Sequence, residues 1–227
     1  MAGVVLLFLS WSVAGCAPAA SEQAIPQQAS LEQTGTATPA NLVSTDIGDQ
    51  EQAMATFAGG CFWCMEQPFD NLPGVVSTTS GYIGGTVDNP TYAQVSNGNT
   101  GHVEAMQVIY DPEQVMYETL LQTFWHNIDP LDDAGQFCDR GSQYRSAIFY
   151  GSPEEQAIAE ASKQSVAERL NQPVATEILP ATTFFAAEDY HQNYYQTHPV
   201  RYKIYRFGCG RDQRLSDIWG ADAPDHE

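Results

Sequence analysis

The chain has 227 residues, of which 43% are hydrophobic and 11% aromatic, so it can bury the core of one domain. Nine Lys and Arg residues stand against 28 Asp and Glu residues, which gives a formal net charge of -19. Because phosphate backbones attract basic surfaces, this balance excludes a general nucleic-acid binder.

The first residues predict an export signal. An apolar run from Ala2 to Ala14 is short for a membrane span and has the length of a signal-peptide core. The following "SVAGC" resembles a bacterial lipobox. We therefore expect residues 1–16 to be a signal peptide with a lipobox that ends at Cys16. Lipid on Cys16 would anchor the protein in the cell envelope or periplasm. No Lys or Arg precedes the run, and this leaves a cytoplasmic protein as the alternative.

Residues 17–50 have the composition of a disordered linker. They contain three prolines, many Ala, Gln, Ser and Thr residues, and no aromatic residue. Such a segment cannot bury enough apolar surface to offset the loss of chain entropy. We expect a single folded domain over residues 51–220.

Periodicity predicts the elements of the first part of this domain in chain order. Strand-like patterns cover 53–60, 74–85, 102–112 and 144–151, and helix-like patterns cover 61–72 and 115–127. A loop rich in Gly and Asn joins the second and third strands over 84–101. The order strand, helix, strand, strand, helix, strand predicts an α+β fold, a two-layer α/β sandwich of the ferredoxin-like, split β-α-β type.

The second part of the domain begins with a well-marked helix over 153–170. Ser152 is its expected N-cap, Pro153 its first residue, and Glu155 the partner in a capping box. A strand near 174–179 and a short helix around 188–195 follow. From Pro199 onward we expect an irregular C-terminal tail.

Cys61 is the strongest catalytic candidate in the sequence. It directly follows Gly59 and Gly60, which join a predicted strand to a predicted helix. A thiol at a helix N-terminus faces unpaired N–H groups, which favour the thiolate, so we expect a lowered pKa and a nucleophile. The rings of Phe62 and Trp63 beside it suggest a small apolar pocket.

Cys64 leaves a second interpretation open, because a C-x-x-C pair is typical of thiol:disulfide exchange. Bulky rings between the two cysteines would obstruct a partner's disulfide, which weakens that interpretation. A zinc site is weaker still, since the chain has no second pair of closely spaced Cys or His ligands.

The segment "GGCFWCMEQPFDNLPGV" resembles the signature of the A-type peptide methionine sulfoxide reductases. The likeness continues in register through "SGYIGG", "NPTYAQV", "GNTGHVEA", "YDP", "FWHNIDP", "DRGSQYRSAIFY" and "EDYHQNYY", over about residues 54–215. "RFGCGRDQRLSDIWG" resembles the tail of a subgroup.

The resemblance implies a repair enzyme for oxidative damage. It would reduce the S epimer of methionine sulfoxide, free or in oxidised proteins, to methionine, with no cofactor and a thioredoxin-like dithiol as final reductant. A monomer is the default expectation.

Glu104 is the candidate general acid. Its neighbours on the same strand face, Met106 and Val108, are apolar, so desolvation should raise its pKa and keep it protonated. A solvent-facing strand position is an equal interpretation of the pattern, and the family match at "GHVE" favours catalysis. The resemblance further implies substrate contacts from Phe62, Trp63, Tyr92, Asp139 and Tyr144.

Three cysteines are candidates for the thiol that would condense with a Cys61 sulfenic acid to form a disulfide. Cys209 lies between two glycines in the expected tail, and we prefer it because a flexible segment can swing to Cys61. Cys64 is second, since a bond within one helical turn would strain that turn. Cys138 is third and is expected to be a core residue.

Five of the nine basic residues follow Pro199, and a solvated patch is the simplest interpretation of them.

Two other functions remain open at this point. One is a periplasmic thiol:disulfide exchanger that uses Cys61 and Cys64. The other is a surface lipoprotein that binds a partner without catalysis.

Overall fold

The computed structural model describes residues 52–224. The expected signal peptide and lipidation site at Cys16, and the expected linker over 17–50, lie outside the described residues. Within the described part of the chain, no helix is both long and apolar enough to cross a membrane.

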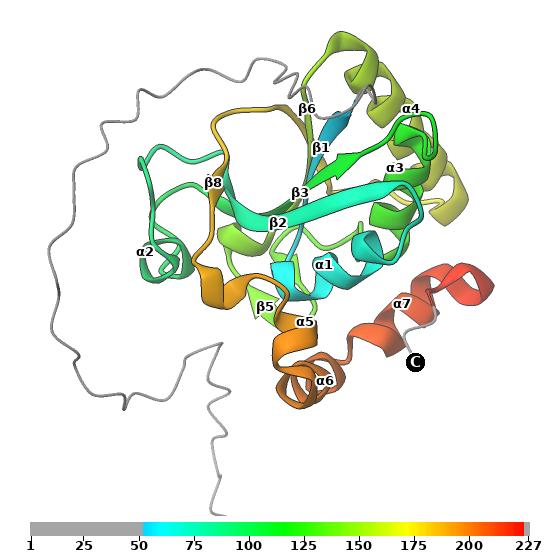
Figure 1. Ribbon diagram of the computed structural model, residues 1–227. Helices are drawn as coiled ribbons and strands as arrows, with labels where there is room; N and C mark the ends of the chain where they lie inside the picture. The colour runs from blue at the N-terminus through cyan, green and yellow to red at the C-terminus, as the bar shows by residue number, and fades with distance from the viewer. Residues whose placement is uncertain (1–51, 225–227) are drawn as a thin grey trace, which may run out of the picture. The chain divides into compact units, whose positions relative to one another are not determined.

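A six-stranded sheet forms the centre of the fold, in the order β7-β6-β1-β3-β2-β8 (Figure 1). Its strands are β1 (Ala53–Gly59), β2 (Val75–Ile83), β3 (Val103–Tyr110), β6 (Ser146–Tyr150), β7 (Glu177–Pro180) and β8 (Phe185–Ala186). All pairs are antiparallel except β6 with β7. The four central strands have the order of a split β-α-β plait, so the expected fold class is confirmed.

Helices α1 (Phe62–Asp70) and α3 (Tyr117–His126) cover one face of the sheet (Figure 1). Phe57 of β1 lies between them, with its ring 5.2 Å from Phe69 and 5.3 Å from Phe124. Successive strand residues point to opposite faces, so Ala58 belongs to the other face. There it joins a second apolar cluster with Ala105 and Phe149.

Helix α4 (Pro153–Leu170) has the predicted bounds. Ser152 caps it by accepting the N–H of Glu155 at 3.1 Å. The Glu155 carboxylate accepts from the N–H of Gly151 at 2.6 Å and not from the N-cap residue, so only half of the predicted capping box forms.

The expectation of an irregular C-terminal tail is wrong. The chain forms α5 (Tyr194–Thr197), α6 (Pro199–Gly208) and α7 (Arg211–Trp219). Helix α7 buries Arg211, Leu215 and Trp219, which are spaced four residues apart and therefore share one face. This face is hidden in the sequence because an arginine begins it.

Several short elements were also missed in the loops. They are α2 (Tyr92–Ser96), β4 (Gly135–Gln136), β5 (Asp139–Arg140), the strand β8, and a 3-10 turn over Ser142–Tyr144. Helix α2 lies inside the loop predicted over 84–101. A full capping box between Thr91 and Gln94 begins it.

Candidate active site

Cys61 is the N-cap residue of α1, and its backbone is not helical (φ -53°, ψ 117°). Gly60 precedes it with φ +80°, a conformation that favours glycine. A side chain at Gly59 would lie 2.5 Å from the sulfur of Met65. The Gly-Gly step is thus needed to place the thiol, which is only 4% exposed.

Cys64 is the partner of Cys61. Both thiols are buried, and a hydrogen bond links their sulfur atoms. Burial and this bond raise the pKa of Cys61. The same bond, together with Arg211 and Arg206, lowers the pKa of Cys64 to about 7. The expected low pKa at Cys61 is therefore wrong for the resting site, where Cys64 and not Cys61 is the thiol whose pKa is lowered.

Glu104 on β3 lies at the N-terminus of α1. One of its carboxyl oxygens accepts the N–H of Phe62 at 3.1 Å, and the side chain is 1% exposed. Burial raises the pKa of Glu104 well above its ordinary value, and the charges of Asp139 and Cys64 add to the shift. The burial expected from Met106 and Val108 is confirmed, because both are fully buried. The raised pKa favours the protonated form of the Glu104 carboxyl.

Trp63 is fixed by residues from the segment after β8. Its ring stacks on Tyr194 at 3.7 Å, and its indole N–H donates to Nδ1 of His191 at 3.1 Å. Burial lowers the pKa of His191 to about 4, so the ring is neutral and its proton lies on Nε2. The ring of Phe62 lies 5.0 Å from that of His191.

Tyr144 lies near the other residues that the sequence predicted for the site. Burial raises its pKa, and Glu104, Tyr92, Cys61 and Asp139 lie near enough to add to the shift in their ionised forms. Residues far apart in the sequence thus converge around one point near the start of α1. Burial also raises the pKa of Asp139.

Further residues support the site and were not predicted. Glu188 accepts the backbone N–H of Tyr92 and the hydroxyl of Tyr82, both at 2.9 Å. Tyr205 of α6 donates to Asp139 and packs edge-on against Trp63 at 5.9 Å. The segment "EDYHQNYY" contains Glu188 and His191, yet periodicity predicted only a short helix there. Short polar stretches carry no signal of a distant partner.

Cys138 and Cys209 form a disulfide, with their Cα atoms 4.9 Å apart. Cys138 is exposed, so its expected place in the core is wrong. Cys209 caps the end of α6 directly before α7 and does not lie in a loose tail. Arg206 and Arg211 are buried, so the basic C-terminal residues are not all a solvated patch.

Metal-ligating side chains gather at one place in the described part of the chain. Cys138, Asp139 and Cys209 lie within 4.8 Å of one another, but two of these three are joined in the disulfide. Asp139 would be left as the single ligand of the group, and this donor set does not fit a zinc centre.

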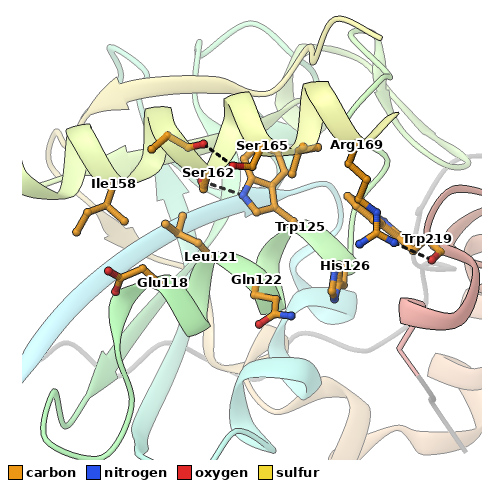
Figure 2. A pocket seen from close by; sticks show the side chains of 12 residues that line it. Glu118, Leu121, Gln122, Trp125, His126, Ile158, Ser162, Ser165, Arg169 and Trp219 are labelled. Atoms are coloured by element: carbon orange, nitrogen blue, oxygen red, sulfur yellow. Dashed lines mark hydrogen bonds between the residues drawn. The ribbon is translucent and has the colours of Figure 1, made fainter. Parts of the chain in front are cut away.

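A cavity of about 500 Å³ lies away from these residues, between α3, α4 and α7 (Figure 2). Leu121, Trp125, His126 and Trp219 line it. Trp125 donates to Ser162 on its wall at 3.1 Å. No predicted site residue lines this cavity, so it is a gap between packed helices and not the site that holds the two thiols.

The site combines a buried thiol at a helix N-cap, a second thiol with a lowered pKa and a carboxyl with a raised pKa. This combination is typical of a thiol-dependent oxidoreductase. The family model described as peptide methionine sulfoxide reductase matches residues 53–223. The chain belongs to this family and is an oxidoreductase.

Similar proteins cover the same region. MsrA of Bacillus subtilis is 50% identical over 174 residues, which are 76% of this chain and 98% of that protein. MsrA of Bacillus licheniformis is 49% identical over 173 residues, 75% of this chain and 96% of that protein.

Two solved structures share the fold. Methionine sulfoxide reductase A of Corynebacterium diphtheriae has a TM-score of 0.60 at 35% identity, over 66% of this chain and 76% of that one. Reduced Mxr1 of Saccharomyces cerevisiae has a TM-score of 0.63 at 28% identity, over 70% and 94% of the two chains.

Proposed function

We propose that the protein reduces the S epimer of methionine sulfoxide, free or in oxidised proteins, with Cys61 as nucleophile and Glu104 as general acid. One observation carries the proposal. The Cys61 thiol and the neutral Glu104 carboxyl meet at the same helix end, where Glu104 holds the N–H of the residue after Cys61. A sulfoxide sulfur becomes electrophilic only when its oxygen receives a proton or a strong hydrogen bond, so both groups are needed.

Oxygen transfer is the first step. Cys61 gives its proton to the Cys64 thiolate and attacks the sulfoxide sulfur, while Glu104 protonates the oxygen. The S–O bond breaks, the sulfoxide gains two electrons and leaves as methionine, and Cys61 becomes a sulfenic acid. Phe62 and Trp63 hold the methyl group, and Tyr92, Asp139 and Tyr144 orient the oxygen.

Disulfide formation is the second step, and we assign it to Cys64. Cys64 gives the proton that it took from Cys61 to the Glu104 carboxylate, and the resulting thiolate attacks the Cys61 sulfur. An S–S bond forms, and the hydroxyl leaves as water after Glu104 protonates it. The two hydrogens of this water derive from the Cys61 thiol and from Glu104, and solvent reprotonates Glu104.

Two observations favour Cys64 over Cys209 as the resolving residue. Cys64 is hydrogen-bonded to Cys61, whereas the sulfur of Cys209 is bonded to Cys138. The objection that a bond would strain one helical turn also loses force, because Cys61 is an N-cap residue outside the helix.

Recycling needs an external dithiol of the thioredoxin type. We propose that the Cys138–Cys209 pair, once reduced, takes the oxidation from the buried Cys61–Cys64 disulfide and presents it to that reductant. Cys138 is exposed and suits this transfer. The protein is proposed to act as a monomer without a cofactor, held in the cell envelope by lipid on Cys16, with a cytoplasmic location as the alternative.

An epimer-resolved assay tests the function. Racemic methionine sulfoxide peptide is incubated with the full-length protein and excess dithiothreitol, and the two epimers are followed by chromatography. We expect the S epimer alone to disappear, and we expect Cys61→Ser to lose all turnover. Cys64→Ser is the matched control: without added dithiol it should still release one methionine per molecule, at a lower rate because the group that takes the Cys61 proton is gone. An untouched S epimer, together with reduction of protein disulfides, would instead identify a thiol:disulfide exchanger.

A further inference from the structure

Arg211 is the first residue of α7, and its side chain lies inside the protein at 1% exposure. One terminal nitrogen donates to the carbonyl oxygens of Asn127 at 2.6 Å and of Gly59 at 3.3 Å, and it lies 3.2 Å from the Met65 sulfur. The guanidinium carbon lies 4.3 Å from the ring centre of Phe137. All of these partners are neutral.

Other arginines of the same region have acidic partners. Arg206 pairs with Asp212, and Arg214 pairs with Asp129 at 2.7 Å. Arg211 has no ion pair among the described residues, and its Nε atom has no hydrogen-bond partner there. Removing an unpaired charge from water is costly, so an uncompensated buried arginine calls for a functional account.

The position of Arg211 supplies such an account. It bonds to Gly59, two residues before Cys61, and contacts Met65, the residue after Cys64. The cation therefore lies behind the turn that carries both thiols. A cation fixed behind this turn, in the protein interior, favours a negative charge on nearby groups that can ionise, which are Cys64 on the turn and Asp139.

We propose that Arg211 is a positioning residue for the reaction, whose buried charge keeps Cys64 ionised beside Cys61. The Cys64 thiolate can then accept the Cys61 proton in oxygen transfer and later close the disulfide. The inference rests on the proposed function and adds to it the residue that sets the charge state of the second thiol.

Several groups face Cys64 and share control of its charge. Cys61 donates a hydrogen bond, and Arg211 and Arg206 attract the thiolate, whereas burial and Asp139 oppose it. Glu104 on β3 and Tyr202 on α6 also interact with Cys64. The balance gives Cys64 a pKa of about 7, and Arg211 is the larger of the two arginine contributions.

The test follows thiolate absorbance against pH in the full chain carrying Cys16→Ser. The Cys138–Cys209 disulfide is kept intact, so Cys61 and Cys64 are the thiols that titrate. Arg211→Gln removes the charge but keeps hydrogen-bond donors, and Arg211→Met serves the same purpose should the Gln variant not fold. Arg211→Lys restores the charge, and Arg214→Gln is the matched control on the same helix.

We expect Arg211→Gln to raise the lower thiol midpoint by about one pH unit, with about fivefold less thiolate near pH 7. Methionine release in a single turnover should slow by the same factor near pH 7, and the ratio of the variant rate to the wild-type rate should return toward one at alkaline pH. Arg211→Lys and Arg214→Gln should keep the wild-type midpoint.

Equal midpoints in wild type and Arg211→Gln would overturn the inference. So would an Arg211→Lys variant that behaves like Arg211→Gln, since that result indicates packing and not charge. Failure of the proposed function would look different, because the wild-type protein would then release no methionine at any pH.

Discussion

Helices α1 and α4 begin in opposite ways. Ser152, Pro153 and the acidic residues 154 and 155 complete the start of α4, and all four are consecutive. The N-cap of α1 is Cys61, whose side chain caps nothing, and its first N–H is taken by Glu104, 42 positions away. Helix α4 thus completes its start with local residues, whereas the start of α1 is completed by a carboxyl group from β3.

The largest expected effect on activity belongs to Glu104→Gln, which removes the acid at the start of α1. The amide keeps an oxygen for the Phe62 N–H, but it has no acidic proton for the sulfoxide. We expect kcat to fall by about 10²- to 10⁴-fold. Because the pKa of Glu104 is raised, the acid form and its activity are present at low pH and are lost as the pH rises through that pKa. The variant should lack this alkaline decline.

The pH profile of kcat, taken with steady-state kinetics, checks this expectation. Glu104→Asp is the control, since it keeps an acid on a shorter side chain and should retain the alkaline decline. A Gln variant with wild-type kcat would remove Glu104 from the mechanism.

Glu66→Gln gives a smaller effect and tests how α1 is held from a distance. The buried Glu66 carboxyl accepts the backbone N–H groups of Asn193 at 2.7 Å and Tyr194 at 3.1 Å. Burial raises its pKa from 4.5 to about 7, so the folded protein binds this proton more tightly than the unfolded chain. Its contribution to stability is present below about pH 4.5 and is lost as the pH rises toward 7.

The Gln variant has no such loss. Between about pH 5 and pH 8 we expect its free energy of unfolding to gain about 1 to 3 kcal/mol relative to wild type, as measured by urea unfolding. A constant difference between the two proteins across that range would contradict the pH dependence.

Ser152→Ala gives the smallest effect and tests the self-contained helix start. Loss of the hydroxyl that accepts the Glu155 N–H should lower the free energy of unfolding by about 1 kcal/mol. Ser152→Asp, which keeps an acceptor, should retain most of the stability. Turnover should be unchanged in both, and a drop in kcat would show that α4 is not independent of the site.

The same contrast explains which parts could be predicted from the sequence. The central strands have a regular alternation and α4 has a local cap, and the expected order of elements is confirmed. Helices α6 and α7 were missed because their buried faces include Arg206 and Arg211, which a sequence pattern assigns to the surface. The raised pKa of Glu104 agrees with one of the two interpretations of its strand neighbours, the buried one.

The rest of the site depends on contacts between distant segments. His191 meets Trp63 across 128 positions of the chain, and no local pattern indicates such a contact. The lowered pKa of Cys64 could not be predicted either, since besides the bond to Cys61 it depends on Arg211 from the other end of the domain.

The depth of the Cys61 sulfur has a consequence for selection among substrates. With 4% of the residue exposed, a sulfoxide must extend its whole side chain inward to reach it. On the proposed function, oxidised methionines in loose or unfolded segments would be repaired well before those fixed within rigid surfaces. Reach, more than neighbouring sequence, would decide which damage is reversed.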